Sequence, residues 1–234
     1  MKKEEFVFQV FESISDDYDA ANNRISLGLH MHWKRSAVER LLRGVPQGGR
    51  VLDLCCGTGD MTELMLSLRP DIRVVGLDFS PAMLAQAEKR LGALRGFELV
   101  LGNAMALPFN TESFDGAVIS FALRNTADYG KVLEEMARVT RTGAPVCCID
   151  SFVPECAFVR PFYQIYFSLM MPLLGGGRKK RTEYRWLCRS TREYVSPEAL
   201  RQLMAEYGLT DAERQRFMFG SCVSLCTYKE GKPR

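Results

Sequence analysis

The segment "VLDLCCGTGD" (51–60) constrains the fold of this chain more than any other stretch of its sequence. Its first four residues predict a mostly apolar strand, and Gly57 and Gly59 follow that strand closely. The segment "DMTELMLSL" (60–68) is amphipathic and predicts a helix. A strand that leads through glycines into a helix predicts the first unit of an α/β sheet, with a ligand near the glycine backbone.

Strand-like and helix-like segments continue to alternate after this loop. The sequence predicts strands at 73–80, 97–104, 114–123 and 144–152, helices at 81–91, 129–140 and near 197–207, and a last strand pair near 214–229. Such alternation predicts a Rossmann-like α/β fold, with a mostly parallel sheet and helices on both faces. Ligands of these sheets bind beyond the carboxyl ends of the strands.

Two regions depart from the alternation. Residues 1–45 predict an N-terminal helical cap, and residues 153–194 predict a helical insertion rich in aromatic residues and methionine. Residues 46–152 are the expected ligand-binding core, and residues 195–234 add a helix and the last strands. A chain of 234 residues is consistent with one domain that contains all four parts.

Composition excludes several classes of protein. A hydrophobic fraction of 47% with 25% charged residues is typical of a folded globular domain. The net charge of +3 is too small to indicate nucleic-acid binding, and the N-terminus lacks the apolar run of a signal peptide. The eight cysteines form no C-x-x-C motif, so we expect reduced, mostly buried thiols in a cytoplasmic protein, with neither a disulfide framework nor a zinc site.

Three kinds of ligand compete for the glycine loop. A P-loop requires a lysine that does not follow here, and a dinucleotide fingerprint requires a third glycine that is missing. An adenosyl cofactor needs only close approach of the backbone and a few polar anchors. Asp53 could meet its ammonium group, and Asp78, at the end of the next strand, could bind its ribose hydroxyls. Asn103 and Ala104, after the third strand, could read its adenine edge.

Five stretches together resemble the class I S-adenosylmethionine-dependent methyltransferases: "VFESISDDYDAANNRISLGLHMHWK" (10–34), "VLDLCCGTGD" (51–60), "GLDFSPAML" (76–84), "GNAMALPFNTESFD" (102–115) and "SFALRN" (120–125). The glycine loop and "LDFS" are shared by methyltransferases generally. "YDAANNRISLGLHMHWK" and "LRN" resemble, more narrowly, the quinone C-methyltransferases of ubiquinone and menaquinone biosynthesis, among them the demethylmenaquinone methyltransferases. The resemblance implies a class I methyltransferase fold with a seven-stranded sheet.

The same resemblance implies S-adenosylmethionine as the cofactor. The positions that match the family's cofactor-holding residues are Thr58, Asp78, Phe79, Asn103, Ala104 and Ser120. Asp53, Gly57 and Gly59 match the floor of the glycine loop. The implied reaction moves the methyl group to a ring carbon of a prenylated quinol, with demethylmenaquinol the first expectation and the benzoquinol of the ubiquinone pathway the second.

Arg124, Asn125 and His30 are the catalytic candidates. Arg124 and Asn125 follow the fourth strand, beside the expected sulfonium. Methylation of a ring carbon requires an electron-rich phenolate, which a fixed guanidinium stabilises; the alternative for Arg124 is a cap of a solvated loop. His30 is either a proton acceptor or a structural hydrogen-bonding group. His30 and His32 are the only histidines, and they do not make a metal site by themselves.

Three segments have both a structural and a functional interpretation. Tyr18 and Asp19 either cap a helix or close over the cofactor. The segment "PFYQIYFSLMMPLL" (161–174) is too short to span a bilayer, and it predicts either a buried core helix or a channel for a prenyl tail. The run "RKKR" (178–181) is either a solvated turn or a peripheral contact with an anionic membrane surface.

Other functions stay open from the sequence alone. A methyltransferase of the same fold could act on another small molecule, and a subunit could bind the cofactor without turnover. Nucleic-acid methylation is disfavoured, because the positive charge forms one short cluster without an aromatic-rich strip. A homodimer is one assembly that the sequence allows.

Overall fold

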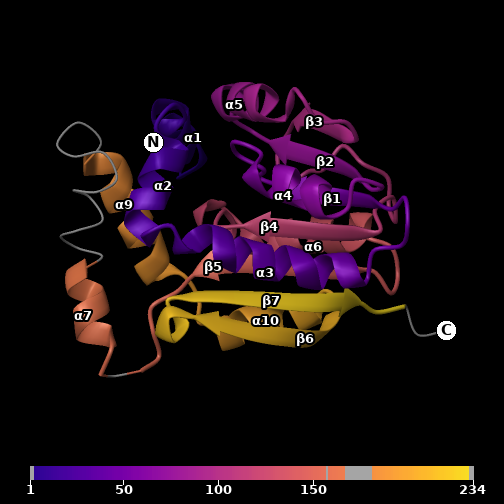
Figure 1. The fold of residues 1–234 in the computed structure, drawn as a ribbon. Coiled ribbons are helices and arrows are strands. Elements are labelled where there is room, and N and C mark those ends of the chain that lie inside the picture. Colours follow the sequence, from indigo (N-terminus) through magenta and orange to yellow (C-terminus); the bar gives the residue numbers. More distant parts are fainter. Residues whose placement is uncertain (1–2, 157, 167–180, 232–234) are drawn as a thin grey trace.

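Seven strands form one mixed sheet in the order β3-β2-β1-β4-β5-β7-β6 in the computed structural model, which describes residues 3–156, 158–166 and 181–231 (Figure 1). The strands are β1 (Arg50–Leu54), β2 (Arg73–Asp78), β3 (Phe97–Leu101), β4 (Gly116–Ser120), β5 (Pro145–Ser151), β6 (Leu209–Phe217) and β7 (Cys222–Lys229). The first five strands pair in parallel, and β7 runs antiparallel to both β5 and β6. The predicted α/β fold is confirmed.

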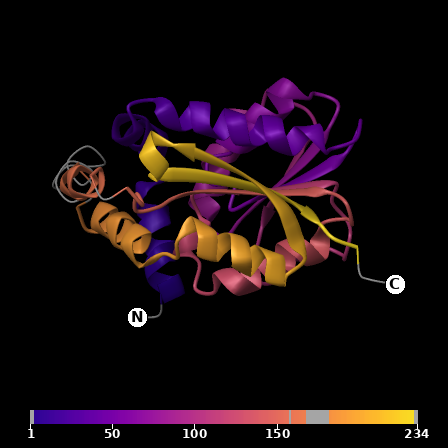
Figure 2. The same ribbon diagram turned by 90° about the horizontal axis from the view of Figure 1, so that it is seen from below.

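The helices lie on both faces of this sheet (Figure 2). They are α1 (Lys3–Ile14), α2 (Tyr18–Ser26), α3 (Leu29–Arg43), α4 (Asp60–Leu68), α5 (Pro81–Leu91), α6 (Tyr129–Val139), α7 (Arg160–Ile165), α9 (Arg181–Glu193) and α10 (Pro197–Glu206), with 3₁₀ turns η1 (Leu123–Asn125) and η3 (Met218–Gly220). None of the helices in the described ranges is long and apolar enough to cross a bilayer.

The hydrophobic core lies on both faces of the sheet, because successive side chains of a strand point to opposite faces. Val51 of β1 packs in a cluster with residues of α3 and α4, whereas its neighbour Leu52 packs in a cluster with residues of α6 and α10. Both side chains are fully buried, because successive residues of a strand point to opposite faces and each face is covered by helices. The central strands are therefore apolar on both sides, which leaves their carboxyl ends as the place for polar groups.

Side-chain caps set where several helices begin. Ser80 accepts a hydrogen bond from the N–H of Met83 and precedes Pro81, the first residue of α5. Asp128 caps α6 and Ser196 caps α10 in the same way. Because α5 begins directly after β2, its N-terminus lies beside Asp78 at the carboxyl end of that strand.

The N-terminal helices attach to the sheet domain through α5 and α9. Val10 and Ile14 of α1 share an apolar cluster with Met83 of α5 and Leu187 of α9. Polar contacts add to it: Gln86 of α5 donates to Asp16, and Arg90 of α5 donates to Asp19. The helices α1 and α2 therefore cover the end of the sheet at which β1 and β2 finish (Figure 1).

Two sequence predictions need correction. The last strand pair begins at Leu209 rather than near 214, because a bulge at Asp211, with a positive φ of 54°, lets β6 continue past an interruption in its apolar pattern. The prediction that no cysteine pairs is also wrong, since Cys147 and Cys226 form a disulfide. They are direct partners in the β5–β7 register, with Cα atoms 4.1 Å apart, and the order of the strands could not be deduced from cysteine spacing.

The segment predicted as an apolar helix (161–174) is described only in its first part, where α7 ends at Ile165. Residues 167–174, and 178–180 of the basic run, lie outside the described residues.

Candidate active site

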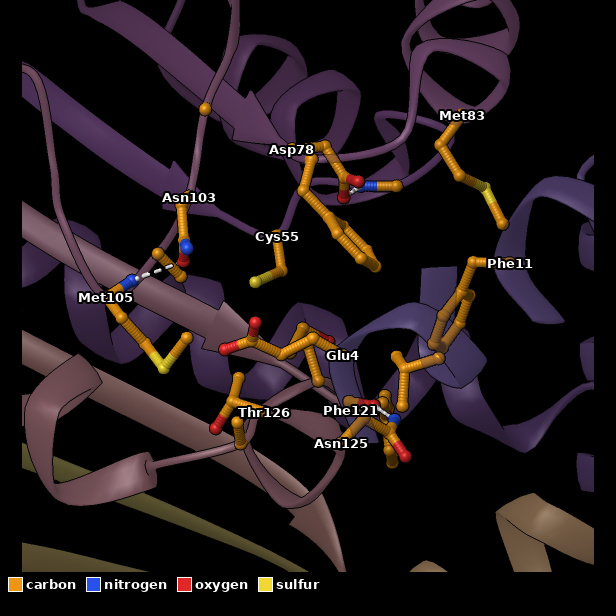
Figure 3. A pocket seen from close by; sticks show the side chains of 18 of the residues that line it. Glu4, Phe11, Cys55, Asp78, Met83, Asn103, Met105, Phe121, Asn125 and Thr126 are labelled. Atoms are coloured by element: carbon orange, nitrogen blue, oxygen red, sulfur yellow. Dashed lines mark hydrogen bonds between the residues drawn. The ribbon is translucent and has the colours of Figure 1, made fainter. Parts of the chain in front are cut away.

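A cavity of about 250 Å³ opens at the carboxyl ends of β1, β2 and β4. The order of the sheet reverses direction between β1 and β4, the point at which open α/β sheets bind their ligands. Figure 3 shows Cys55, Asp78 and Asn103 of the sheet domain on one side, with Glu4 and Phe11 of α1 on the other. We call this the first cavity.

Asp78 lies in the first cavity at the end of β2 and is 4% exposed. Its Oδ2 accepts from the N–H of Gly57 and its Oδ1 from the N–H of Ser80, each at 2.9 Å. Burial raises the pKa of Asp78, and these backbone N–H groups partly oppose the rise because they favour the ionised form. The carboxylate is held rigidly and keeps lone pairs for a pair of hydroxyls.

The two glycines of the loop have different functions. Gly57 has a φ of +54° and lines the first cavity, and a Cβ placed on it would meet nothing within 4 Å. Gly59 also has a positive φ, of +79°, but a Cβ there would lie 3.1 Å from Ala87 and Leu91 of α5. Gly57 therefore leaves room for a ligand, whereas Gly59 lets α4 and α5 pack closely.

Asn103 and Ala104 reach the first cavity from the loop after β3. Asn103 Oδ1 accepts from the N–H of Met105 at 2.9 Å, which fixes the side chain and leaves its amide NH₂ for a ligand. Phe79 and Met83 supply apolar wall next to them, and Phe79 packs edge-on against Phe8 of α1. This end of the cavity suits a flat heterocycle.

Ser120 and Asn125 carry polar atoms that lack protein partners. Ser120 Oγ and Asn125 Oδ1 are both buried without a hydrogen bond, and both residues line the first cavity. An unsatisfied buried polar atom costs about 1–3 kcal/mol, so such groups in a cavity indicate a ligand that satisfies them.

Three predicted cofactor residues do not line the first cavity: Gly59, Asp53 and Thr58. Asp53 is buried beneath the loop, where its Oδ2 accepts from the hydroxyl of Thr62 at 2.7 Å, and burial raises its pKa to about 7. Thr58 donates to Asp19 of α2 at 2.8 Å and accepts from Arg90. The structure therefore places Thr58 between the cap and α5, and Asp53 one layer below the cavity.

A second cavity, of about 420 Å³, lies next to the first. Phe11, Tyr18 and Phe121 line both, so the two cavities adjoin at these three aromatic residues, which form a shared wall. Large apolar side chains dominate the second cavity, and Leu27 and Phe219 at its edge are 74% and 75% exposed.

Arg124 lines the second cavity but is already paired. Its guanidinium donates through Nη1 to Asp150 Oδ1 and to the carbonyl of Phe121, and its backbone N–H points to Asp150 Oδ2. Its Nε–H is buried without a partner. The structure therefore holds the guanidinium fixed, leaves its buried Nε–H without a protein partner, and offsets its charge with Asp150. Asp150 was not predicted from the sequence, because only the β4–β5 pairing brings it beside Arg124.

His30 also lines the second cavity. Its Nδ1 lies 2.7 Å from the hydroxyl of Ser26. Partial burial, and then the nearby charge of Lys34, lower the pKa of His30, so the ring is neutral at pH 7. Arg124 and His30 thus lie at the second cavity, while Asn125 lies at the first.

Backbone strain is concentrated at these cavities. Seven residues other than glycine have a positive φ in the described ranges, and five of them line one cavity or both. They are Leu27, Cys55, Phe121, Met218 and Phe219. Such conformations cost of order 1–3 kcal/mol each and cluster at functional sites. No such signal is visible in the sequence, which is why Cys55 and Phe121 were not predicted.

Comparison with known proteins decides among the ligands that this geometry allows. The model of the ubiE/COQ5 methyltransferase family matches residues 1–229.

The chain belongs to the ubiE/COQ5 methyltransferase family.

Two relatives that align with nearly the whole chain are named demethylmenaquinone methyltransferase. The protein from Geobacillus stearothermophilus is 40% identical over 231 residues, which cover 97% of this chain and 98% of the relative. The protein from Lactococcus lactis is 40% identical over 235 residues, which cover 99% and 92%. Membership of the ubiE/COQ5 family makes the chain an S-adenosylmethionine-dependent C-methyltransferase, with quinone C-methylation as its broad chemistry.

Solved structures agree with the ubiE/COQ5 assignment at the level of the fold. A Haloferax volcanii methyltransferase, in complex with the Trm112 methyltransferase activator, has a TM-score of 0.71 at 19% identity and covers 94% of this chain and 98% of its own. A SAM-dependent methyltransferase from Aquifex aeolicus has a TM-score of 0.58 at 17% identity, with 81% and 88% covered.

The residues of the first cavity fit S-adenosylmethionine. Asp78 suits its ribose hydroxyls, Asn103 and the apolar wall suit its adenine, and the unpaired atoms of Ser120 and Asn125 suit its remaining polar groups. Within the described residues, no three His, Cys, Asp or Glu side chains gather closely enough to hold a metal ion.

Proposed function

We propose that this chain methylates a ring carbon of a prenylated quinol, and that its substrate is demethylmenaquinol. The observation that carries the proposal is the shared aromatic wall of Phe11, Tyr18 and Phe121. Because these residues line both cavities, a ring bound in the second cavity lies next to a ligand of the first, so the two reactants can meet with aromatic side chains around them. The names of the relatives support the choice of quinol.

The lining of the second cavity supports a prenylated substrate. Leu27, Phe162, Met218 and Phe219 all line it and are 74%, 64%, 49% and 75% exposed. Scattered exposed apolar residues are ordinary, but several at one cavity mouth indicate an apolar ligand. A prenyl tail leaving along these side chains would cover surface that is otherwise in contact with water.

The proposed roles of the residues follow from their contacts. S-adenosylmethionine supplies an electrophilic methyl group on a positively charged sulfur. In this proposal the Nε–H of Arg124 donates to the phenolate oxygen of the quinol, which satisfies a donor that has no protein partner. His30, neutral at pH 7, accepts the proton of that hydroxyl. Asn125 orients the methyl donor in the first cavity.

A direct assay tests the substrate. The purified protein would be incubated with S-adenosylmethionine and either demethylmenaquinol or the benzoquinol of the ubiquinone pathway, both with the same prenyl tail. We expect mass spectrometry to show methylated naphthoquinol, formed faster than methylated benzoquinol. Preference for the benzoquinol would correct the substrate. Cofactor binding without methylation of either quinol would favour another small-molecule substrate or a binding subunit.

We also propose a cytoplasmic protein that contacts the anionic face of the membrane. The run "RKKR" (178–181) supplies four adjacent positive charges, and each contributes about 1 kcal/mol near an anionic surface. A substrate with a long prenyl tail resides in the bilayer, so a peripheral contact would shorten its path to the second cavity.

A further inference from the structure

Ser26 and His30 form a hydrogen-bonded pair at the turn between α2 and α3. Ser26 is the last residue of α2, and His30 is the second residue of α3. Leu27 and Gly28 between them both adopt positive φ, of 52° and 78°, so the chain reverses sharply and returns the imidazole to the serine. Ser26 Oγ lies 2.7 Å from His30 Nδ1 and 2.7 Å from the carbonyl oxygen of Asn22.

The single hydroxyl proton of Ser26 determines how this pair is arranged. The carbonyl oxygen of Asn22 can only accept, so the hydroxyl donates its proton there. The oxygen of Ser26 must then accept from His30, and His30 Nδ1 must carry a hydrogen. In a neutral imidazole this leaves the lone pair on Nε2. Within the described residues, the ring makes no other hydrogen bond.

The charged groups around the ring come from three helices. Lys34 lies one turn further along α3, Asp19 is on α2 and Asp60 is the first residue of α4. Lys34 donates to Asp60, so these two charges largely offset each other at the ring. The imidazole therefore faces the second cavity as a neutral group whose free nitrogen is Nε2.

We propose that Ser26 is a positioning residue that holds His30 in the Nδ1–H tautomer, so that Nε2 accepts a hydroxyl proton of the quinol. This inference rests on the proposed function. The O–H bond of the quinol breaks and its proton moves to Nε2, while the electron pair of the ring carbon forms the bond to the methyl group. The bond between that methyl and sulfur breaks, and its electrons stay on sulfur.

Two further proton transfers complete the reaction. The methylated carbon loses its hydrogen as a proton, which restores the aromatic ring, and His30 returns its proton to the phenolate oxygen. One proton is released to solvent for each methyl group transferred, and nothing is oxidised or reduced.

The tautomer can be measured without any methylation reaction. Because His30 and His32 are the only histidines, His32→Gln leaves a protein with one imidazole, and His32 is an exposed residue of α3. Two-bond ¹⁵N–¹H spectra at pH 8 should show the Nδ1–H tautomer in this background. Adding Ser26→Ala should convert the spectrum to a mixture of tautomers or to the Nε2–H form. Adding Ser26→Thr should restore Nδ1–H, since threonine keeps the hydroxyl.

Kinetics provide the second readout. We expect Ser26→Ala to lower kcat about tenfold with the KM for S-adenosylmethionine unchanged, and Ser26→Thr to recover most of the loss. Ser67→Ala is the matched control, because Ser67 also donates to a carbonyl of its own helix but is exposed on α4. It should change neither the spectrum nor kcat.

An Nε2–H tautomer in the parent protein, or an unchanged tautomer in Ser26→Ala, would overturn the proposal. A slower Ser26→Ala enzyme with an unchanged tautomer would show only a structural role for the serine. If the parent protein methylates no quinol, the proposed function fails while the spectra still report the Ser26–His30 pair.

Discussion

Glu12 of α1 accepts a hydrogen bond from the hydroxyl of Ser80 at 2.5 Å and from the N–H of Ala82 at 3.1 Å. Ser80 and Ala82 flank the first residue of α5, so Glu12 brings a negative charge to the N-terminus of that helix. Asp78, two residues before Ser80, lies in the first cavity. This contact therefore joins the cap to the turn that carries the proposed ribose-binding carboxylate.

Glu12→Ala should loosen the cap over the first cavity. We expect S-adenosylmethionine to bind roughly three- to tenfold more weakly, and unfolding to need about 1–2 kcal/mol less free energy, because charge-assisted hydrogen bonds are lost. Calorimetry and chemical denaturation measure the two effects. Glu88→Ala, on the exposed side of α5, is the control and should change neither. Equal affinities for Glu12→Ala and the parent would show that the cap does not hold the cofactor.

Asp78→Asn should weaken S-adenosylmethionine binding by roughly 1.5–3 kcal/mol, because a charged acceptor for the ribose hydroxyls is lost. Asparagine has an acceptor oxygen for only one of the two N–H groups, those of Gly57 and Ser80, that Asp78 now binds, so part of the loss in this variant comes from the turn itself. A 2′-deoxy analogue of S-adenosylhomocysteine separates ribose recognition from folding. The deoxy change should weaken binding to the parent but add little to the loss in Asp78→Asn. Additive losses would mean that Asp78 does not contact that hydroxyl.

Arg124→Ala should lower kcat about 10²-fold while cofactor affinity stays nearly constant, because stabilisation of the phenolate acts in the transition state. The substitution leaves Asp150 buried without its partner, so the fold could be lost for reasons unrelated to catalysis. The double variant Arg124→Ala with Asp150→Asn removes that unpaired charge. Steady-state kinetics on this folded double variant decide the role, and normal turnover would return Arg124 to a loop-capping function.

Asp53 should make this protein less stable as the pH rises from about 4 to 7. Burial raises its pKa to about 7 in the folded state, from an ordinary value near 3.8 in the unfolded chain. The folded state therefore binds more protons between these values, and the unfolding free energy falls as the pH rises from about 4 to 7. Below this window both states are protonated, and above it both are ionised.

Asp53→Asn removes this dependence. The unfolding free energy of the variant minus that of the parent should be roughly 1–3 kcal/mol larger at pH 8 than at pH 5. Chemical denaturation of both proteins at the two pH values measures this difference. The hydroxyl of Thr62 can still donate to the oxygen of asparagine. If the difference between the two proteins is the same at both pH values, Asp53 does not titrate in this range.

The basic run should produce weak binding to vesicles that contain anionic lipid, and none to neutral vesicles. The attraction should disappear as salt is added, since a Debye length of roughly 8–10 Å screens exposed charges. Replacing Arg178, Lys179, Lys180 and Arg181 with serine should abolish co-sedimentation while leaving turnover of a short-tailed, water-soluble quinol unchanged. Equal recovery on both kinds of vesicle would leave the run as an ordinary solvated turn.

The sequence by itself determined the α/β fold and the position of the cofactor cavity. Strand and helix periods are local properties, and the residues after Leu54, Asp78 and Leu101 lie together because the carboxyl ends of parallel strands meet at one edge. Gly57, Asp78 and Asn103 could therefore be predicted from the strand pattern, Ser120 was implied by the family resemblance, and all four line the first cavity. The family could likewise be read from motifs that stay contiguous in the chain.

Only the tertiary structure decided the partners of these residues. Asp150 beside Arg124, Cys226 bonded to Cys147 and Asp19 beside Thr58 join strands or helices that are distant in sequence. The strand order and the packing of the cap bring these pairs together, and neither is a local property. From the sequence, Arg124 was either a stabiliser of the phenolate or a loop cap, and Thr58 was a cofactor-holding position by resemblance. The folded chain pairs one with a buried carboxylate and uses the other to attach its cap.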